Sequence, residues 1–259
     1  MALPVALQLF SVREQMAEDF EGTLRKVKEM GYDGVELAWL GDRTAVEAKE
    51  IIEGIGLKMM SAHVGLEELE KDEVLDDYKA AGLKYIVLPF MIPEFTVEWR
   101  EDKIRRITEI GKRCKERGMV LLYHNHEFEF KEIEGIRLID SIYDGIPAEL
   151  LQSELDTCWV NIGGEKPDDF VRKFTGRAPV VHLKDFVGTH KGEGMDMGDI
   201  VLRPVGYGRQ DMPAIIQASI DAGAEWLVVE QDEPSMDKTA LECAKMSIEY
   251  LHQLEIMQG

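Results

Sequence analysis

Ionisable side chains stand at the ends of short apolar runs in this sequence. Asp156, His182 and Glu230 each follow such a run, and Glu154 and Lys184 lie two residues from the first two of them. Carboxylate oxygens with one imidazole nitrogen suit a fairly hard divalent cation with about six ligand positions. Carboxylates buried together raise one another's pKa and lose hydration, and a bound cation compensates both effects. These residues predict one divalent metal ion, with Mn²⁺, Mg²⁺ or Co²⁺ preferred and Zn²⁺ left open.

Further polar groups follow other apolar runs and suit contacts with a small polar substrate: Glu36, His63, His124 and His126. Plainer interpretations stay open. His63 could be a hydrogen-bonded core histidine, and Lys184 could pair with Asp185 in solvent. Three aromatic residues are more typical of packing than of sugar stacking: Trp39, Trp159 and Tyr123.

The elements that must position these groups follow a repeated pattern. A charged helical stretch, a glycine and a short apolar run recur as KEMGYDGVEL, IEGIGLKMMSA, KAAGLKYIVLP, CKERGMVLLYH and IDAGAEWLVVE. Glycine ends a helix in the left-handed conformation at no steric cost, and a buried strand can then begin. The pattern predicts β-α units with strands near 5–10, 34–38, 57–62, 85–89, 119–124, 150–155, 179–183 and 226–230.

Eight such strands predict a single (β/α)8 TIM barrel over residues 1–259. The alternative is an open, doubly wound sheet, which is disfavoured because no G-x-G-x-x-G motif follows the first strand. In a barrel the carboxyl ends of all strands face one shared bowl, where active sites lie. The long glycine-rich stretch 184–211 interrupts the rhythm, and we expect it to cover the substrate.

Composition narrows the classes of partner. Fifty acidic and thirty basic residues give a net charge of −20, which repels nucleic acid and anionic membranes. No apolar run reaches the length of about 20 residues that spans a bilayer, and no export signal is visible, so we expect a cytoplasmic protein. Three widely spaced cysteines favour reduced thiols: Cys114, Cys158 and Cys243.

Together these segments resemble the sugar phosphate isomerase/epimerase family, the xylose-isomerase-like barrels of the AP endonuclease 2-like superfamily. The resemblance is carried by SAHV at 61–64, YHNHEFEF at 123–130, ELDTCWV at 154–160, VVHLKDF at 180–186 and VVEQDE at 228–233. It covers nearly the whole chain in the expected order.

The resemblance implies a metal held by a glutamate of strand five together with Asp156, His182 and Glu230. Strand five departs from the family pattern, because His124 stands where many epimerases have glutamate. We assign Glu129, in the loop that follows, as the fourth ligand. His124 and His126 remain open as substitute ligands or substrate-binding groups.

A divalent ion that chelates a carbonyl and a neighbouring hydroxyl would stabilise the enediolate formed when a C–H bond is deprotonated. Glu230 and Glu129 are the candidate acid/base pair, with Glu154 as the alternative. His126 is a further catalytic candidate, and with His63 and Lys184 it would hold substrate oxygens and stabilise negative charge.

These expectations describe a metal-dependent isomerase or epimerase acting on a sugar or keto-sugar. The alternative on the same site is a lyase that dehydrates a keto-sugar or keto-inositol. An abasic-site nuclease, opposed by the charge, and a non-catalytic sugar-binding barrel come after these. The expected partner is a small sugar-like molecule, with a homo-oligomer left open.

Overall fold

Eight parallel strands close into a barrel in the computed structural model, which describes residues 2–189 and 198–258. Around the barrel their order is β1-β12-β9-β8-β5-β4-β3-β2, and β1 pairs with both β12 and β2. The predicted TIM barrel is confirmed and the open sheet is excluded. The strands are β1 (Val5–Gln8), β2 (Gly34–Leu37), β3 (Lys58–His63), β4 (Tyr85–Leu88), β5 (Val120–His124), β8 (Gln152–Asp156), β9 (Val180–Leu183) and β12 (Trp226–Val229).

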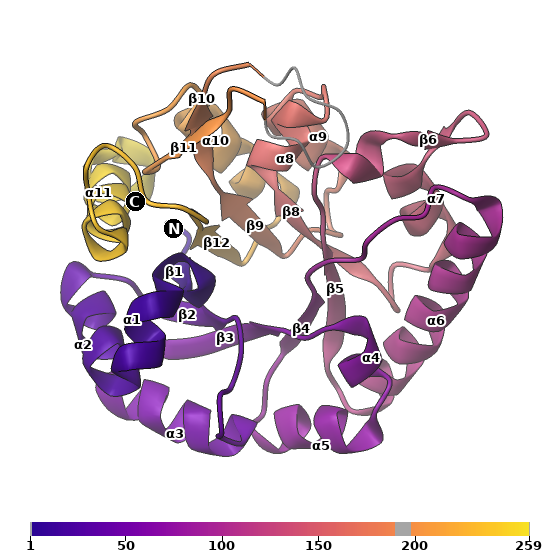
Figure 1. Cartoon of the computed structure of the whole chain (residues 1–259), viewed down its shortest axis with the longest axis horizontal. Coiled ribbons are helices and arrows are strands. Elements are labelled where there is room, and N and C mark those ends of the chain that lie inside the picture. The colour runs from indigo at the N-terminus through magenta and orange to yellow at the C-terminus, as the bar shows by residue number, and fades with distance from the viewer. Residues whose placement is uncertain (1, 190–197, 259) are drawn as a thin grey trace.

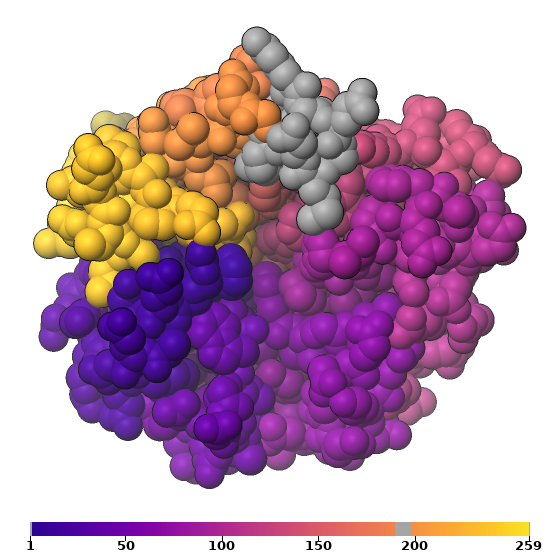
Figure 2. Space-filling model, in the orientation of Figure 1, coloured from indigo at the N-terminus to yellow at the C-terminus, as the bar shows by residue number. Residues whose placement is uncertain are grey.

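Helices surround the strands as an outer ring (Figure 1). The last helix packs against α2, so the two ends of the chain meet, as the adjoining indigo and yellow surfaces of Figure 2 show. The α-helices are α1 (Arg13–Glu18), α2 (Phe20–Met30), α3 (Ala45–Ile55), α4 (Leu66–Leu69), α5 (Asp72–Ala80), α6 (Val97–Glu116), α7 (Leu138–Gly145), α8 (Thr157–Ile162), α9 (Pro167–Lys173), α10 (Met212–Ala222) and α11 (Ala240–Gln253). Three short 3₁₀ turns are η1 (Leu9–Val12), η2 (Phe128–Phe130) and η3 (Glu255–Met257).

The repeated glycines end helices as expected. Gly31 after α2 and Gly223 after α10 have φ of 102° and 84°, a left-handed conformation that glycine adopts freely. Each backbone then turns directly into the next strand. The glycines therefore mark the helix ends in the sequence, because the left-handed conformation at a helix end favours glycine over other residues.

Alternation along the strands builds layers inside the barrel. The apolar floor consists of Ala6, Met60, Tyr85, Val87, Leu122, Val180 and Val228. Because side chains two residues apart share a strand face, the residues two positions beyond Val228 and Val180, namely Glu230 and His182, lie above that floor. The outward-facing residues of the strands pack against the helices in a much larger apolar core. Polar groups are thus held over a rigid apolar base.

The described part of the chain also contains two small antiparallel ribbons outside the barrel sheet. One pairs β6 (Glu132–Ile133) with β7 (Ile136–Arg137), and the other pairs β10 (Asp185–Val187) with β11 (Val201–Arg203). The second ribbon lies within the stretch 184–211 that is predicted to cover the substrate. The centre of that stretch, 190–197, lies outside the described residues, so its covering role stays a prediction.

All three cysteines are buried free thiols. Over the part of the chain that the structure describes, no helix is long and apolar enough to cross a membrane.

Candidate active site

A buried layer of histidines and glutamates lies directly above the apolar floor. His182 Nε2 lies 2.9 Å from Glu36 Oε2 and 3.0 Å from Glu154 Oε1. His63 Nε2 contacts the same two oxygens, at 3.1 Å and 2.8 Å respectively. The four side chains come from β2, β3, β8 and β9 and form one closed network of alternating charge.

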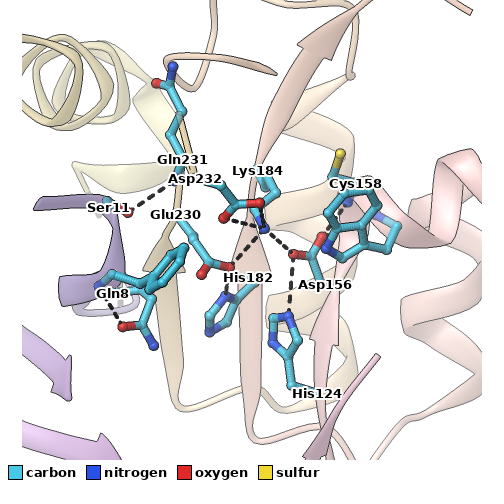
Figure 3. A network of polar contacts seen from close by, with 12 residues as sticks. Gln8, Ser11, His124, Asp156, Cys158, His182, Lys184, Glu230, Gln231 and Asp232 are labelled. Carbon is cyan, nitrogen blue, oxygen red and sulfur yellow. Dashed lines mark hydrogen bonds and ion pairs between the residues drawn. The ribbon is translucent and has the colours of Figure 1, made fainter. Parts of the chain in front are cut away.

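A second layer of polar side chains, on the side of His182 away from Glu36 and Glu154, includes Glu230, Lys184 and Asp156 (Figure 3). His182 uses its other nitrogen, Nδ1, to contact Glu230 Oε2 at 3.1 Å. Lys184 Nζ lies among three carboxylates, 3.0 Å from Glu230 Oε2, 3.4 Å from Asp156 Oδ2 and 3.0 Å from Asp232 Oδ1. The ammonium also sits 4.9 Å from the centre of the Trp159 ring. Lys184 therefore belongs to the site and does not pair with Asp185 in solvent.

His124 connects the two layers. Its Nδ1 lies 3.0 Å from Glu154 Oε1 below, and its Nε2 lies 3.7 Å from Asp156 Oδ2 above. His124 and Glu154 are cross-strand neighbours, as are Asp156 and His182, so strand register alone brings these groups together.

Burial and charge set the protonation of the histidines. Burial disfavours the charged form of His63, but Glu36 and Glu154 outweigh it and raise its pKa to about 10. The pKa of His182 is raised well above its ordinary value by Glu154 and Glu36 against the same opposition. For His124 and His126 the neighbouring carboxylates do not outweigh burial, which lowers the pKa of each to about 3. Without a bound cation, the carboxylates therefore favour a proton on His63 and on His182, whereas burial favours the neutral forms of His124 and His126.

The carboxylates still outnumber the cations. Burial opposes the charge of Glu230, yet Lys184 and His182 hold its pKa well below the ordinary value. Burial raises the pKa of Asp156 to about 6, with Lys184 acting against it. One ammonium and two imidazolium ions face five carboxyl groups, those of Glu36, Glu154, Asp156, Glu230 and Asp232. A further positive charge would therefore be stabilised in this site.

A metal ion fits this donor set. Two groups of side chains bring ligand atoms within 4.8 Å of one another: His63, His124, Glu154 and His182, and, nearer the mouth, His124, Asp156, His182 and Glu230. Asp156 Oδ2 and Glu154 Oε2 are buried without a hydrogen-bond partner in the described structure. Buried acceptors of this kind are rare unless an ion or water completes them. Three of the four predicted ligands meet in the outer group.

Glu129, the fourth predicted ligand, is placed elsewhere. The hydroxyl of Tyr123 donates to one of its oxygens, and the backbone N–H of His126 donates to the other at 2.7 Å. Burial raises the pKa of Glu129 to about 8, so this carboxyl is largely neutral at pH 7. Neither ligand group includes it, and His124 stands in both.

A cavity of about 370 Å³ opens above the outer layer. Among the described residues that line it, carboxylates come only from the end of β12, as Glu230 and Asp232. The rest of the lining is Phe10, Ala38, His63, Pro89, Phe90, His124, His126 and Lys184. His126 Nδ1 is buried and has no hydrogen-bond partner among the described residues, and its ring stacks against Phe128 and Trp159. Glu36 and Glu154 lie beneath the cavity rather than in its wall.

The structure adds residues that the predicted site omitted. Asp232 contacts Lys184, and Phe10 and Phe90 form part of the cavity wall. Period two along a strand could have found Asp232, because it lies two residues beyond Glu230. Of the aromatics expected to pack, Tyr123 and Trp159 do so, whereas 39% of Trp39 is exposed.

Comparison with known proteins agrees with this fold. The sequence profile of the xylose isomerase-like TIM barrels matches residues 24–254. An inosose dehydratase of Clostridium tetani is 31% identical over 93 residues, which are 36% of this chain and 30% of that protein. Inosose dehydratase 2 of Bacillus cereus is 26% identical over 207 residues, 70% of this chain and 69% of its own length.

Solved structures share the whole architecture. A sugar phosphate isomerase/epimerase from Parabacteroides distasonis has a TM-score of 0.82 at 18% identity, and the match covers 99% of this chain and 96% of that one. Identity this low shows the fold alone.

Proposed function

Because the chain belongs to the family of xylose isomerase-like TIM barrels, we propose that it is a lyase that removes water from an unphosphorylated keto-sugar or keto-inositol. The observation that carries this proposal is the one-sided distribution of carboxylates around the cavity. Glu230 and Asp232 both extend from β12. The imidazoles that line the cavity come from β5 and β3, each three strands away around the barrel.

This distribution favours elimination over epimerisation. Moving a proton between two faces of a carbon with carboxylates requires one on each face. Here His124 replaces the glutamate that the family resemblance places on strand five, and Glu129 is buried outside the cavity wall. Elimination needs one base and one acid, which Glu230 and Lys184 provide 3.0 Å apart.

The step that these residues support is a β-elimination. The carboxylate of Glu230 takes the proton from the carbon next to the substrate carbonyl. The electrons of that C–H bond form a carbon–carbon double bond as the C–O bond at the next carbon breaks. The ammonium of Lys184 donates a proton to the departing hydroxide, which leaves as water. His63, charged and at the cavity wall, donates a hydrogen bond to the carbonyl oxygen as negative charge develops there.

We assign the metal to His124, Asp156, His182 and Glu230, so His124 takes the place first given to Glu129. A ligand imidazole is neutral, so the bound ion would displace the proton that the neighbouring carboxylates favour on His182 in its absence. A divalent ion held there would polarise the substrate carbonyl and make the neighbouring C–H bond more acidic. Lys184 shares Asp156 and Glu230 with that position and balances the charge that remains.

The side chains that line the cavity favour an uncharged substrate over a phosphorylated one. Lys184 is the one lysine or arginine among the described residues of the lining, and three carboxylates already surround it. A phosphate would lack a cationic partner there. Keto-inositols are included because the two relatives compared above carry the name inosose dehydratase.

A specific observation favours one second candidate, a sugar isomerase or epimerase. His126 Nδ1 points to no described partner while the residue lines the cavity, so this neutral imidazole could accept or return a proton across from Glu230. Loss of water from the substrate separates the two reactions, because an isomerase or epimerase gives a product of unchanged composition.

The test is a panel of unphosphorylated ketoses and keto-inositols, incubated in D₂O with protein and Mn²⁺. We expect a product lighter by one water, with new ultraviolet absorption from the conjugated double bond. A product of unchanged composition with deuterium on carbon would instead establish isomerisation and overturn the lyase. Glu230→Gln should lower kcat about 10²- to 10⁴-fold. Glu233→Gln, three residues on and largely exposed, is the matched control and should leave kcat unchanged.

A further inference from the structure

A second cavity adjoins the first at the mouth of the barrel. Its volume is about 340 Å³, within the range of small-molecule sites. Ala38 and His63 line both cavities, so the two are neighbours across these residues. From there the second cavity extends over the loops after β2 and β3 to helices α4 and α5. Together the two cavities extend further than the cavity above Glu230 alone.

The lining of this second cavity combines an exposed indole with hydrogen-bond acceptors. Trp39 is 39% exposed, unlike the packed Trp159, and Val64, Val74 and Tyr78 continue the apolar surface. Three carboxylates complete it: Glu68, Glu73 and Asp77. Over the described lining there is no lysine or arginine, so anionic groups are repelled.

Sugar rings match both features. Their C–H faces pack on an indole, while their hydroxyls donate hydrogen bonds to carboxylates, which only accept. Asp77 accepts a hydrogen bond from the backbone N–H of Ala45, and Glu68 pairs with Lys71, so each keeps further acceptor sites. A purely aromatic group would pack on the indole but add no donor to these carboxylates. A phosphate would meet Glu68, Glu73 and Asp77 with like charge.

We propose that the second cavity binds a second sugar ring, so that the substrate is a keto-sugar joined to another, unphosphorylated sugar unit. The proposal rests on the proposed function for the identity of the keto-sugar, and it adds the class of the attached group. His63 stands at the junction, where it can contact the keto-sugar while the linkage passes into the second cavity.

Gly65 offers a way to fill the second cavity without touching the first. It lines the second cavity, and a Cβ added there would meet no heavy atom within 4 Å. Its φ of −63° and ψ of 156° suit any L-residue, so a larger side chain causes no backbone strain. Gly54, an exposed glycine of α3 with equally open surroundings, is the matched control.

The experiment compares binding of cellobiose and maltose with binding of D-glucose, by calorimetry and by the fluorescence of the tryptophans. We expect at least one disaccharide to bind about tenfold more tightly than glucose. Gly65→Leu and Trp39→Ala should each remove that advantage, whereas Gly54→Leu should keep it. Thermal midpoints of the variants verify that each is folded.

Phenyl β-D-glucoside, measured alongside, replaces the second sugar ring with an aromatic ring. Three outcomes overturn the proposal: equal binding of glucose and both disaccharides, an advantage that survives Gly65→Leu, or an advantage over glucose shown only by phenyl β-D-glucoside. The proposed function can fail separately. If keto-monosaccharides are dehydrated but no disaccharide gains affinity, the lyase stands and the second subsite falls. If disaccharides bind as expected but no keto-sugar is converted, the subsite stands and the lyase falls.

Discussion

Two histidines in this site, His182 and His124, each contact carboxylates through both ring nitrogens. His182 contacts Glu230 through Nδ1 and Glu36 and Glu154 through Nε2, so its ring is fixed between two layers. His124 bridges the same layers from β5. Because a hydrogen bond at one ring nitrogen determines what the other can do, the buried glutamates orient the imidazoles that we assign to the metal.

Glu129 shows how burial separates two chemically identical groups. Glu230 is held ionised by Lys184 and His182, whereas burial raises the pKa of Glu129 to about 8. A neutral carboxyl is a poor base and a poor metal ligand. Its contacts with Tyr123 and His126 instead secure the loop after β5.

We predict that Glu129→Gln weakens the pH dependence of stability. The folded-state pKa of Glu129 lies above its ordinary value, so its stabilising contribution is present at low pH. That contribution is lost as the pH rises from about 4.5 towards 8, by about 1.4 kcal/mol per pH unit. Urea unfolding between pH 5 and 9 should show a steeper fall for the parent than for Glu129→Gln. Parallel curves would show that Glu129 ionises normally in the folded protein.

At the scale of elements, a single carboxylate holds the ribbon of β10 and β11 and the turn that follows it. The ribbon of β10 and β11 depends on Asp185, whose carboxylate accepts hydrogen bonds from the backbone N–H groups of Phe186, Gly206, Gly208 and Gln210 at 2.9–3.1 Å. A Cβ on Gly208 would lie 2.1 Å from Asp185 Oδ1, so the close approach requires glycine. One buried side chain thus organises the turn that leads into α10.

We predict that Asp185→Ala destabilises the protein by about 2–4 kcal/mol, because it leaves one buried and three partly buried backbone N–H groups without their acceptor. Urea unfolding at pH 7 measures the loss. Asp144→Ala, which removes an exposed carboxylate from the end of α7, is the control and should stay within about 0.5 kcal/mol of the parent. Equal stabilities for the two variants would mean that water replaces Asp185 in the turn.

At the scale of the whole molecule, barrel closure concentrates negative charge. The chain carries a net charge of −20, and five of its carboxyl groups lie within one site above the barrel core. Net charge of this size disfavours the compact state, and a bound cation at the barrel axis relieves part of the cost. Stability and metal binding should therefore be linked.

We predict that Mn²⁺ added to metal-free protein at about 100 times its Kd raises the thermal midpoint by roughly 5–10 °C. His124→Ala should lose that shift, because it removes a proposed ligand. Glu129→Gln should retain the shift, because the carboxyl of Glu129 accepts hydrogen bonds from Tyr123 and from the backbone N–H of His126 and is not a proposed ligand. The reverse result, with the shift kept in His124→Ala and lost in Glu129→Gln, would restore the original ligand assignment.

The order of elements, and the strand ends that supply most residues of the candidate site, could be predicted from the sequence alone. Helix-ending glycines and short apolar runs are local signals, and closure of parallel strands places their carboxyl ends together by geometry. Asp156, His182 and Glu230 follow from that rule because each stands at a strand end. The net charge, which opposes nucleic acid as a partner, is likewise a property of composition.

Only the tertiary structure decided what each polar group does. Whether a carboxyl is ionised depends on neighbours from distant strands, as the contrast between Glu129 and Glu230 shows. The placement of Lys184 among three carboxylates, and of Trp39 beside a second cavity, arises from side chains separated along the sequence but adjacent in space. The local sequence pattern determines which residues stand at the carboxyl ends of the strands. Their ionisation and their contacts depend on the side chains that the fold places around them.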